Sequence, residues 1–182
     1  SAKHLLGGDD VGRDVLSRLL YGGRVSLAVG IFSTAVSVIV GIPLGMLAAF
    51  YRGAFEVVVM RLSDIFMSFP STILILFLVS MFGPSIVTVT VVIGVLGWPK
   101  FARQIYGSVL SIREKDYIEG AVAIGAKDKL IITRYILPNA VAPIFISITF
   151  RIASAIILES SLSFLGMGVQ PPAASWGNML YN

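Results

Sequence analysis

Long uncharged hydrophobic segments alternate along this chain with shorter segments that carry most of its charges. No charged residue lies between Arg24 and Arg52, a stretch of 27 residues. A helix needs about 20 predominantly apolar residues to cross the hydrocarbon core of a bilayer. The pattern therefore predicts a first membrane-spanning helix at about 25–50.

A second uncharged stretch covers residues 65–99 and is 35 residues long. It is too long for one ordinary span and short of the ~40 residues that two spans need. Gly83-Pro84 near its middle is a strong turn signal. We predict two spans joined by a short hairpin at this turn, at about 57–82 and 85–106, each including a polar end.

The next stretch, residues 107–139, is the only long polar part of the chain. Residues 100–134 carry seven Lys and Arg against four Asp and Glu. Basic residues are enriched in the cytoplasmic loops of membrane proteins, so we expect this loop in the cytoplasm. A fourth span is predicted at about 141–165, after helix breaks that we expect at Pro138 and Pro143.

Alternation of these spans places both ends of the chain outside. We expect residues 1–24 to form an external or interfacial lead-in helix and residues 25–165 to form the membrane domain. Residues 166–182 are expected to be an external segment that leads to a further span. Charged residues make up only 13% of the chain, against about 25% in soluble domains. The expected fold is an all-α, polytopic membrane helix bundle with four spans.

The composition also excludes several kinds of chemistry. There is no cysteine and His4 is the only histidine, so we expect neither a disulfide nor the usual His/Cys metal site. No lysine follows a glycine, so the G-x-x-x-x-G-K-[ST] phosphate loop is absent and the chain itself is not an ATP-hydrolysing enzyme. The net charge of +4 is small and the basic residues flank hydrophobic segments, which favours membrane lipid over nucleic acid as a neighbour.

Small residues recur at spacings of three and four along the first span. They are Ser26, Gly30, Ser33, Ser37, Gly41 and Gly45. Such a stripe allows two helix backbones to approach closely in lipid. Pro43 lacks a backbone donor and is expected to kink or loosen this part of the helix. We expect ordinary helix packing on this stripe, with a gating hinge as the alternative.

The polar stretch can form two short helices that meet at a glycine. Residues 117–124 suit one helix, Gly125 permits a turn, and Asp128 can cap a second helix over 129–137. Pro138 is expected to stop that helix. A compact projection of this kind can fit a groove on a partner protein. The alternative is an amphipathic hairpin lying on the lipid headgroups.

Polar residues also recur inside the last predicted span. Ser147, Arg151, Ser154 and Ser161 follow one another at steps of four, three and seven residues. Charges within a span usually face the bundle interior or a wet cavity. Arg151 and Glu159 are roughly 12 Å apart along a helix axis and cannot pair with each other. This face is a candidate translocation path, and the alternative is structural contact with another span, which is the stronger hypothesis for Glu159.

The sequence from Glu119 to Pro138 resembles a known motif. The EAA signature, written E-A-A-x3-G-x9-I-x-L-P, is found in the membrane subunits of binding-protein-dependent ABC importers. Glu119, Ala121, Gly125, Leu137 and Pro138 match it in register, whereas Gly120 and Tyr135 depart from it.

Other segments are similar to permeases of the dipeptide, oligopeptide and nickel importers. These segments are 7–22, 60–64 with Phe69-Pro70, 160–166, Pro171-Pro172 and 175–177. The resemblance implies a six-span permease, of which this chain would hold the second to the fifth spans, in a bacterial or archaeal plasma (inner) membrane.

The resemblance also implies partners and roles. The partners are a second, similar permease, two cytoplasmic ATPase subunits that hold ATP and Mg, and an extracytoplasmic solute-binding protein. The residues implied in coupling to the ATPase are Glu119, Gly120, Ala121, Gly125, Asp128, Leu137 and Pro138. The cargo would be a peptide or a nickel complex. A stand-alone channel, a secondary transporter and a non-transporting membrane scaffold are the alternatives.

Overall fold

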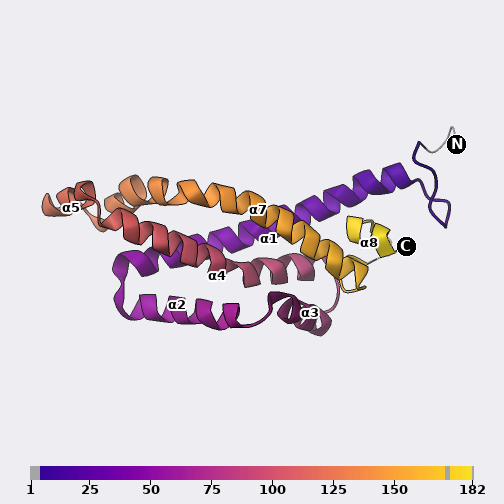
Figure 1. Cartoon of the computed structure of the whole chain (residues 1–182), viewed down its shortest axis with the longest axis horizontal. Coiled ribbons are helices and arrows are strands. Elements are labelled where there is room, and N and C mark those ends of the chain that lie inside the picture. The colour runs from indigo at the N-terminus through magenta and orange to yellow at the C-terminus, as the bar shows by residue number, and fades with distance from the viewer. Residues whose placement is uncertain (1–4, 171–172, 182) are drawn as a thin grey trace. The chain divides into compact units, whose positions relative to one another are not determined.

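The computed structural model describes residues 5–170 and 173–181, and these residues are almost entirely helical (Figure 1). His4 and the Pro171-Pro172 pair lie outside the described residues. The elements are α1 (Val15–Tyr51), α2 (Gly53–Ser68), α3 (Ser71–Phe82), α4 (Ile86–Arg113), α5 (Asp116–Ala123), α6 (Asp128–Leu130), the π-helix η1 (Ile131–Ile136), α7 (Leu137–Phe164) and α8 (Trp176–Tyr181). The all-α class expected from the hydropathy pattern is confirmed.

Three helices of the described chain are long and apolar enough to cross a membrane. They are α1, α4 and the continuous helical segment 128–164. The pair α2 and α3 passes the same test only when its two helices are taken together, as one bent span. The described residues therefore contain up to four spans, which is the number predicted.

The chain divides into two compact units. Unit 1 comprises residues 1–35, 70–95 and 150–182, and unit 2 comprises residues 36–69 and 96–149. Unit 2 has a core of buried aliphatic and aromatic side chains that includes Phe101, Ile105, Ile118 and Ile136. α5 and η1 thus share one hydrophobic core with the membrane helices of unit 2.

The span predicted at 57–82 is broken at Phe69-Pro70. Proline has no backbone N–H and disfavours helical dihedrals at the residue before it. Phe69 accordingly has extended dihedrals, φ −91° and ψ 141°. Helix formation resumes at Ser71, so the span predicted at 57–82 consists of two helices, α2 and α3, and not of one.

Two other prolines do not act as predicted. The helix continues through Pro143, and Pro138 is the second residue of α7 and not the end of the preceding helix. η1 runs directly into α7, so Pro138 lies inside the continuous helical segment 128–164, where neighbouring turns can accommodate its missing donor. The π-helix η1 precedes Pro138, and the Asn139 side-chain amide donates to the carbonyl oxygen of Tyr135 at 2.7 Å. Helix breaks at these two positions were therefore the wrong expectation.

The N-terminal segment also differs from the lead-in helix predicted for residues 1–24. Residues 5–14 form turns, in which the Asp9 carboxylate accepts hydrogen bonds from the N–H groups of Val11 and Arg13 at 3.1 and 2.8 Å. α1 begins only at Val15, where the Asp14 carboxylate accepts from the N–H of Ser17 at 3.0 Å. This is the hydrogen bond of a helix N-cap. The first span is thus longer than predicted, and residues 5–14 before it contain no separate helix.

The small residues of α1 pack against other helices, as the stripe predicts. In unit 1, a Cβ atom built on Gly30 would lie 2.7 Å from the side chain of Ile156. In unit 2, a Cβ on Gly41 would lie 2.5 Å from the carbonyl oxygen of Trp98. Real Cβ atoms do not approach so closely, so only glycine allows these helix contacts. The helix continues through Pro43.

Polar pairs also connect α2 with α4 in unit 2. Asp64 forms an ion pair with Arg103, and the Tyr106 hydroxyl donates to the Glu56 carboxylate. Charged groups in a membrane-spanning segment are costly unless they are paired. These two pairs account for four polar side chains near one end of the predicted spans.

Candidate functional site

The candidate coupling site lies entirely in unit 2 and begins with α5. Ile118 and Ala121, three residues apart on this helix, are 2% and 7% exposed and join the core of unit 2. Glu119 and Gly120 lie on the opposite, exposed face. The predicted helix over 117–124 is confirmed within one residue at each end. Of the signature residues on α5, Ala121 anchors the helix, while Glu119 and Gly120 are free to contact a partner.

α5 ends at Gly125, which has the left-handed φ of +77°. The N–H of Gly125 donates to the Val122 carbonyl at 2.9 Å, and the N–H of Ala126 donates to the Ala121 carbonyl at 3.0 Å. These two bonds define a Schellman motif, the helix ending that places glycine at the left-handed position. The predicted glycine elbow is confirmed.

Asp128 does not cap the following helix, contrary to the prediction. It is the first residue of α6, and Lys127 occupies the cap position without a side-chain hydrogen bond. A carboxylate in the first turn still interacts favourably with the positive end of the helix dipole. The carbonyl of Lys127 accepts from the N–H groups of Leu130 and Ile131 at 2.8 and 3.1 Å.

The last two signature residues begin α7. Leu137 is half-buried, and Pro138 is exposed. Ile131 and Ile136, at the two ends of η1, are buried in the same core as Ile118. The two arms of the hairpin that turns at Gly125 are therefore held together by this core.

Sequence reasoning missed Arg113, the last residue of α4. Its guanidinium Nη1 donates to the carbonyl oxygen of Phe50 at 2.8 Å and lies over the Phe50 ring, 5.6 Å from the ring centroid. It also reaches the carbonyl of Ala49, at 3.4 Å. Both carbonyls lie in the last turn of α1, where backbone acceptors lack a partner within the helix and a nearby cation is favourable. Arg113 lies in the polar stretch 107–139, beyond the helix predicted at 85–106, so neither its place at the end of α4 nor its contact with α1 could be predicted from the sequence.

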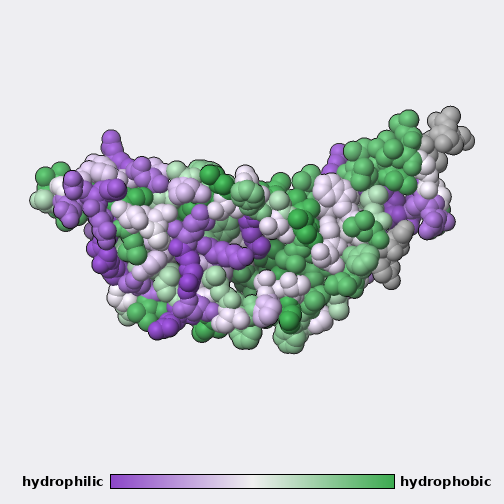
Figure 2. Space-filling model, in the orientation of Figure 1, coloured by the Kyte–Doolittle hydropathy of each residue, from purple (hydrophilic) through white to green (hydrophobic). Residues whose placement is uncertain are grey.

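The outer face of the hairpin combines charges with exposed apolar side chains. Ile124 is 86% exposed and Val122 is 59% exposed, beside the exposed Glu119 and Lys127. Figure 2 shows hydrophilic side chains gathered around the α5 end, with a small hydrophobic area among them. Among residues 5–170 and 173–181, no three His, Asp or Glu side chains gather as a metal site. This surface suits protein docking.

The polar residues of α7 fall into both units. In unit 2, Ser147 accepts a hydrogen bond from the side-chain amide of Gln104 at 2.7 Å. In unit 1, Arg151 Nη2 donates to the carbonyl oxygen of Ile93 at 2.9 Å, while its buried Nε has no partner among the described residues. Arg151 is thus hydrogen-bonded to a backbone carbonyl oxygen.

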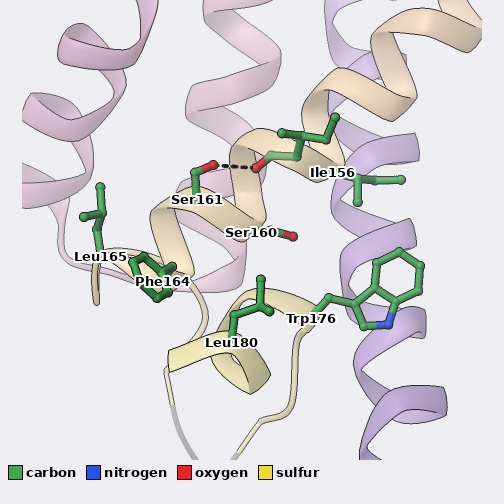
Figure 3. A pocket seen from close by; sticks show the side chains of 8 residues that line it. Ile156, Ser160, Ser161, Phe164, Leu165, Trp176 and Leu180 are labelled. Atoms are coloured by element: carbon green, nitrogen blue, oxygen red, sulfur yellow. Dashed lines mark hydrogen bonds between the residues drawn. The ribbon is translucent and has the colours of Figure 1, made fainter. Parts of the chain in front are cut away.

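Ser154 and Ser161 differ from Glu159 in their surroundings. Both serines are exposed, and each donates to the carbonyl four residues earlier, as the dashed line at Ser161 in Figure 3 shows. Ser161 also lines a mostly apolar recess with Phe164, Trp176 and other residues of α7 and α8. Glu159 is fully buried and accepts hydrogen bonds from two hydroxyls. Glu159 therefore does not share the exposed face of the serines.

A chain of long apolar helices with a compact, charge-rich hairpin has the features of a membrane transport component. Residues 41–181 match the family described as the binding-protein-dependent transport system inner membrane component. The chain belongs to this family, and it is an inner membrane protein. The family resemblance drawn from the EAA signature is confirmed.

Several known proteins are similar to the chain. It is 42% identical to the glutathione transport system permease protein GsiD of Pectobacterium atrosepticum, over 99% of this chain and 60% of that protein. It is 39% identical to the dipeptide transport system permease protein DppC of Alkalihalophilus pseudofirmus, over 99% of this chain and 59% of that protein. The chain thus spans about three-fifths of the length of these relatives.

A solved structure of the methionine ABC transporter MetNI, in an inward-facing conformation, has a similar fold. The TM-score is 0.75 at 22% identity, covering 91% of this chain and 80% of that chain. At this identity the likeness concerns the fold alone. It agrees with the all-α membrane architecture of the chain.

Proposed function

We propose that this chain is the translocation part of an ATP-driven importer for peptides or for glutathione-like compounds. Its partners would be a second permease, two cytoplasmic ATPase subunits that bind ATP and Mg, and an extracytoplasmic binding protein. The family assignment and the names of the similar permeases, which concern glutathione and dipeptide transport, support this proposal. A nickel complex as cargo stays an alternative that these names do not favour.

The observation that carries the proposal is the construction of the hairpin. Ile118 and Ala121 fix α5 to the core of unit 2, while Val122 and Ile124 extend outward with most of their surface exposed. An aliphatic side chain left 86% exposed at a helix end forgoes the free energy of burial, and a partner protein can supply that burial. The hairpin is thus a rigid projection whose free surface fits a groove on an ATPase subunit.

Co-purification of the full-length permease with its ATPase tests this proposal. Ile124→Asp should weaken ATPase retention by about tenfold or more, because burying an unpaired carboxylate in an interface is unfavourable. Val11→Asp is a matched control, since Val11 is also an aliphatic residue, 75% exposed, in the N-terminal turns that we predict to lie outside. Equal ATPase retention by both variants would contradict docking through the hairpin.

We also propose that the exposed polar face of α7 contributes to the translocation path. Ser154 and Ser161 expose hydroxyls, and Arg151 adds a positive charge that is incompletely hydrogen-bonded. A guanidinium binds carboxylates well, and every peptide carries one at its C-terminus. The hydroxyl of Ser147, in unit 2, instead accepts a hydrogen bond from Gln104. Glu159 is buried, so we do not assign it to the translocation path.

A further inference from the structure

Glu159 is a fully buried carboxyl whose described partners are uncharged. Its two oxygens accept hydrogen bonds from Ser26 Oγ at 2.8 Å and from Ser163 Oγ at 2.6 Å. Burying a carboxyl is unfavourable unless hydrogen bonds replace those made to water. Ser26 belongs to α1, and Ser163 belongs to the last turn of α7, so the carboxyl connects two helices of unit 1.

Each of these two hydroxyls also contacts the segment that follows α7. Ser163 Oγ accepts from the N–H of Val169 at 3.0 Å, and Ser26 Oγ accepts from the N–H of Trp176 at 3.3 Å. A hydroxyl has one donor and two lone pairs, so it can donate to Glu159 and accept from a backbone N–H at the same time. Glu159 thus orients both hydroxyls as acceptors for the backbone of residues 167–170 and 173–178, which we call the clasp.

Close backbone packing seats the clasp on both helices. A Cβ atom built on Gly22 of α1 would lie 3.1 Å from Ser175, and one on Gly23 would lie 3.1 Å from the Trp176 ring. One on Gly177 would lie 2.6 Å from the Ser163 side chain of α7. The Trp176 indole N–H also donates to the Leu19 carbonyl of α1 at 3.1 Å, and Figure 3 shows the ring beside that helix.

The clasp has internal hydrogen bonds as well. The Asn178 side-chain amide, which is buried, donates to the carbonyl oxygens of Val169 and Ala173 at 2.6 and 3.1 Å. α7 ends at Phe164, and two residues later Gly166 has the left-handed φ of +76°, which turns the chain out of the helical direction. The segment is therefore a folded unit, and Glu159 lies at the point where it meets α1 and α7.

We infer that Glu159 is a positioning residue that holds the clasp against α1 and α7, so that the clasp and the parts of these helices in unit 1 move as one body. The inference is independent of the proposed function, because it concerns how the chain is held together and not which cargo or ATPase it binds. It places Glu159 outside the translocation path. The carboxyl acts through Ser26 and Ser163 on the backbone of the clasp.

Cysteine labelling of the full-length permease in its assembled complex tests the inference, since this chain has no cysteine. Val169 of the clasp is 1% exposed and its neighbour Gln170 is exposed, so Val169→Cys and Gln170→Cys are matched reporters. With Glu159 present, a membrane-impermeant maleimide should label position 169 at least about tenfold more slowly than position 170. Glu159→Leu should raise labelling at 169 by about tenfold or more, because both hydroxyls lose their acceptor.

Two further variants make the test specific. Glu159→Gln keeps one carbonyl oxygen as an acceptor and should restore much of the protection at position 169. Ser161→Ala should leave labelling unchanged, because that hydroxyl is exposed and donates to a carbonyl of its own helix. If Glu159→Leu abolishes complex assembly, Ser163→Ala replaces it, since it removes the contact to Val169 and should expose position 169 in the same way.

Two results would overturn the inference. One is continued protection of position 169 in the assembled Glu159→Leu or Ser163→Ala complex, which would show that the clasp is held without the carboxyl. The other is an equal rise in labelling in Ser161→Ala, which would indicate general loosening of α7. Failure of ATPase docking in the Ile124→Asp experiment would leave these outcomes unaffected.

Discussion

Gly45 of α1 offers a direct test of how closely α1 and α4 pack in unit 2. A Cβ atom at this position would overlap the carbonyl oxygen of Ala102 and lie 2.6 Å from Cγ2 of Ile105. Ordinary carbon–carbon contact begins near 3.5 Å, so the contact with Ile105 alone would require a local separation of about 0.9 Å, and the overlap with the Ala102 carbonyl requires more. The main obstacle is backbone, which cannot rotate away as the end of a flexible side chain can.

Gly45→Ala should therefore destabilise the protein. Overpacking costs about 1–3 kcal/mol, and the higher helix propensity of alanine recovers up to about 1 kcal/mol. Because the obstacle is backbone, the cost lies in the upper part of this range, about 2–3 kcal/mol. The net loss is then about 1–2 kcal/mol, which corresponds to a midpoint of thermal unfolding lowered by about 2–8 °C for a chain of this size. Heating the detergent-purified full-length permease and measuring the monodisperse fraction that remains gives this midpoint.

Gly107→Ala is the matched control. Gly107 lies in α4, is exposed, and has no atom within 4 Å of a built Cβ. Its replacement should leave the midpoint unchanged or raise it slightly, because only the propensity gain applies. A Gly45→Ala protein as stable as the Gly107→Ala protein would refute the close packing of α1 on α4.

The other predictions concern sidedness, the translocation path and pH. In the cysteine-free chain, Asp116→Cys should be labelled only from the cytoplasm and Gln170→Cys only from outside; labelling of both from one side would show that the spans are wrongly counted. Arg151→Ala should reduce peptide transport at least about tenfold with complex yield preserved, whereas reduced yield would indicate a structural role. The N–H of Arg13 foremost, with the Arg18 guanidinium, lowers the pKa of Asp9 from 3.8 to about 2. Its stabilising effect is present above about pH 4 and is lost as the pH falls through 2, so the unfolding midpoints of the native chain and Asp9→Asn should differ at pH 5 and converge near pH 2.

Much of the architecture could be predicted because it depends on local properties of the chain. Uncharged stretches of sufficient length indicate membrane helices regardless of what they pack against. The elbow at Gly125 was predictable for the same reason, since only glycine takes a φ of +77° without strain. The break at Phe69-Pro70 also follows from a local property, the effect of proline on the preceding residue. It was missed because the prediction relied on the length of the apolar stretch.

The errors at Pro138 and Pro143 have a different origin. A proline weakens a helix locally, but neighbouring turns, a π-helical segment and side chains can satisfy the freed carbonyls. η1 and the Asn139 amide lie next to Pro138 in the structure. Whether such compensation exists depends on the conformation of the surrounding turns, which residue type alone does not specify.

Side-chain roles in the spans were decided only by tertiary structure. The sequence indicated that Arg151 and Glu159 need partners, and it showed that they cannot pair with each other. It could not show that Arg151 would meet the carbonyl of Ile93, or that Glu159 would meet Ser26, 133 residues away in the chain. Helical periodicity determines which residues share a face, whereas the packing of helices determines what that face contacts. The hydrophobic effect that drives transfer of the spans into lipid is non-directional. The sequence by itself therefore determined that this chain forms membrane helices with a projecting hairpin. The specific packing and hydrogen bonds between helices decided which polar groups hold them together.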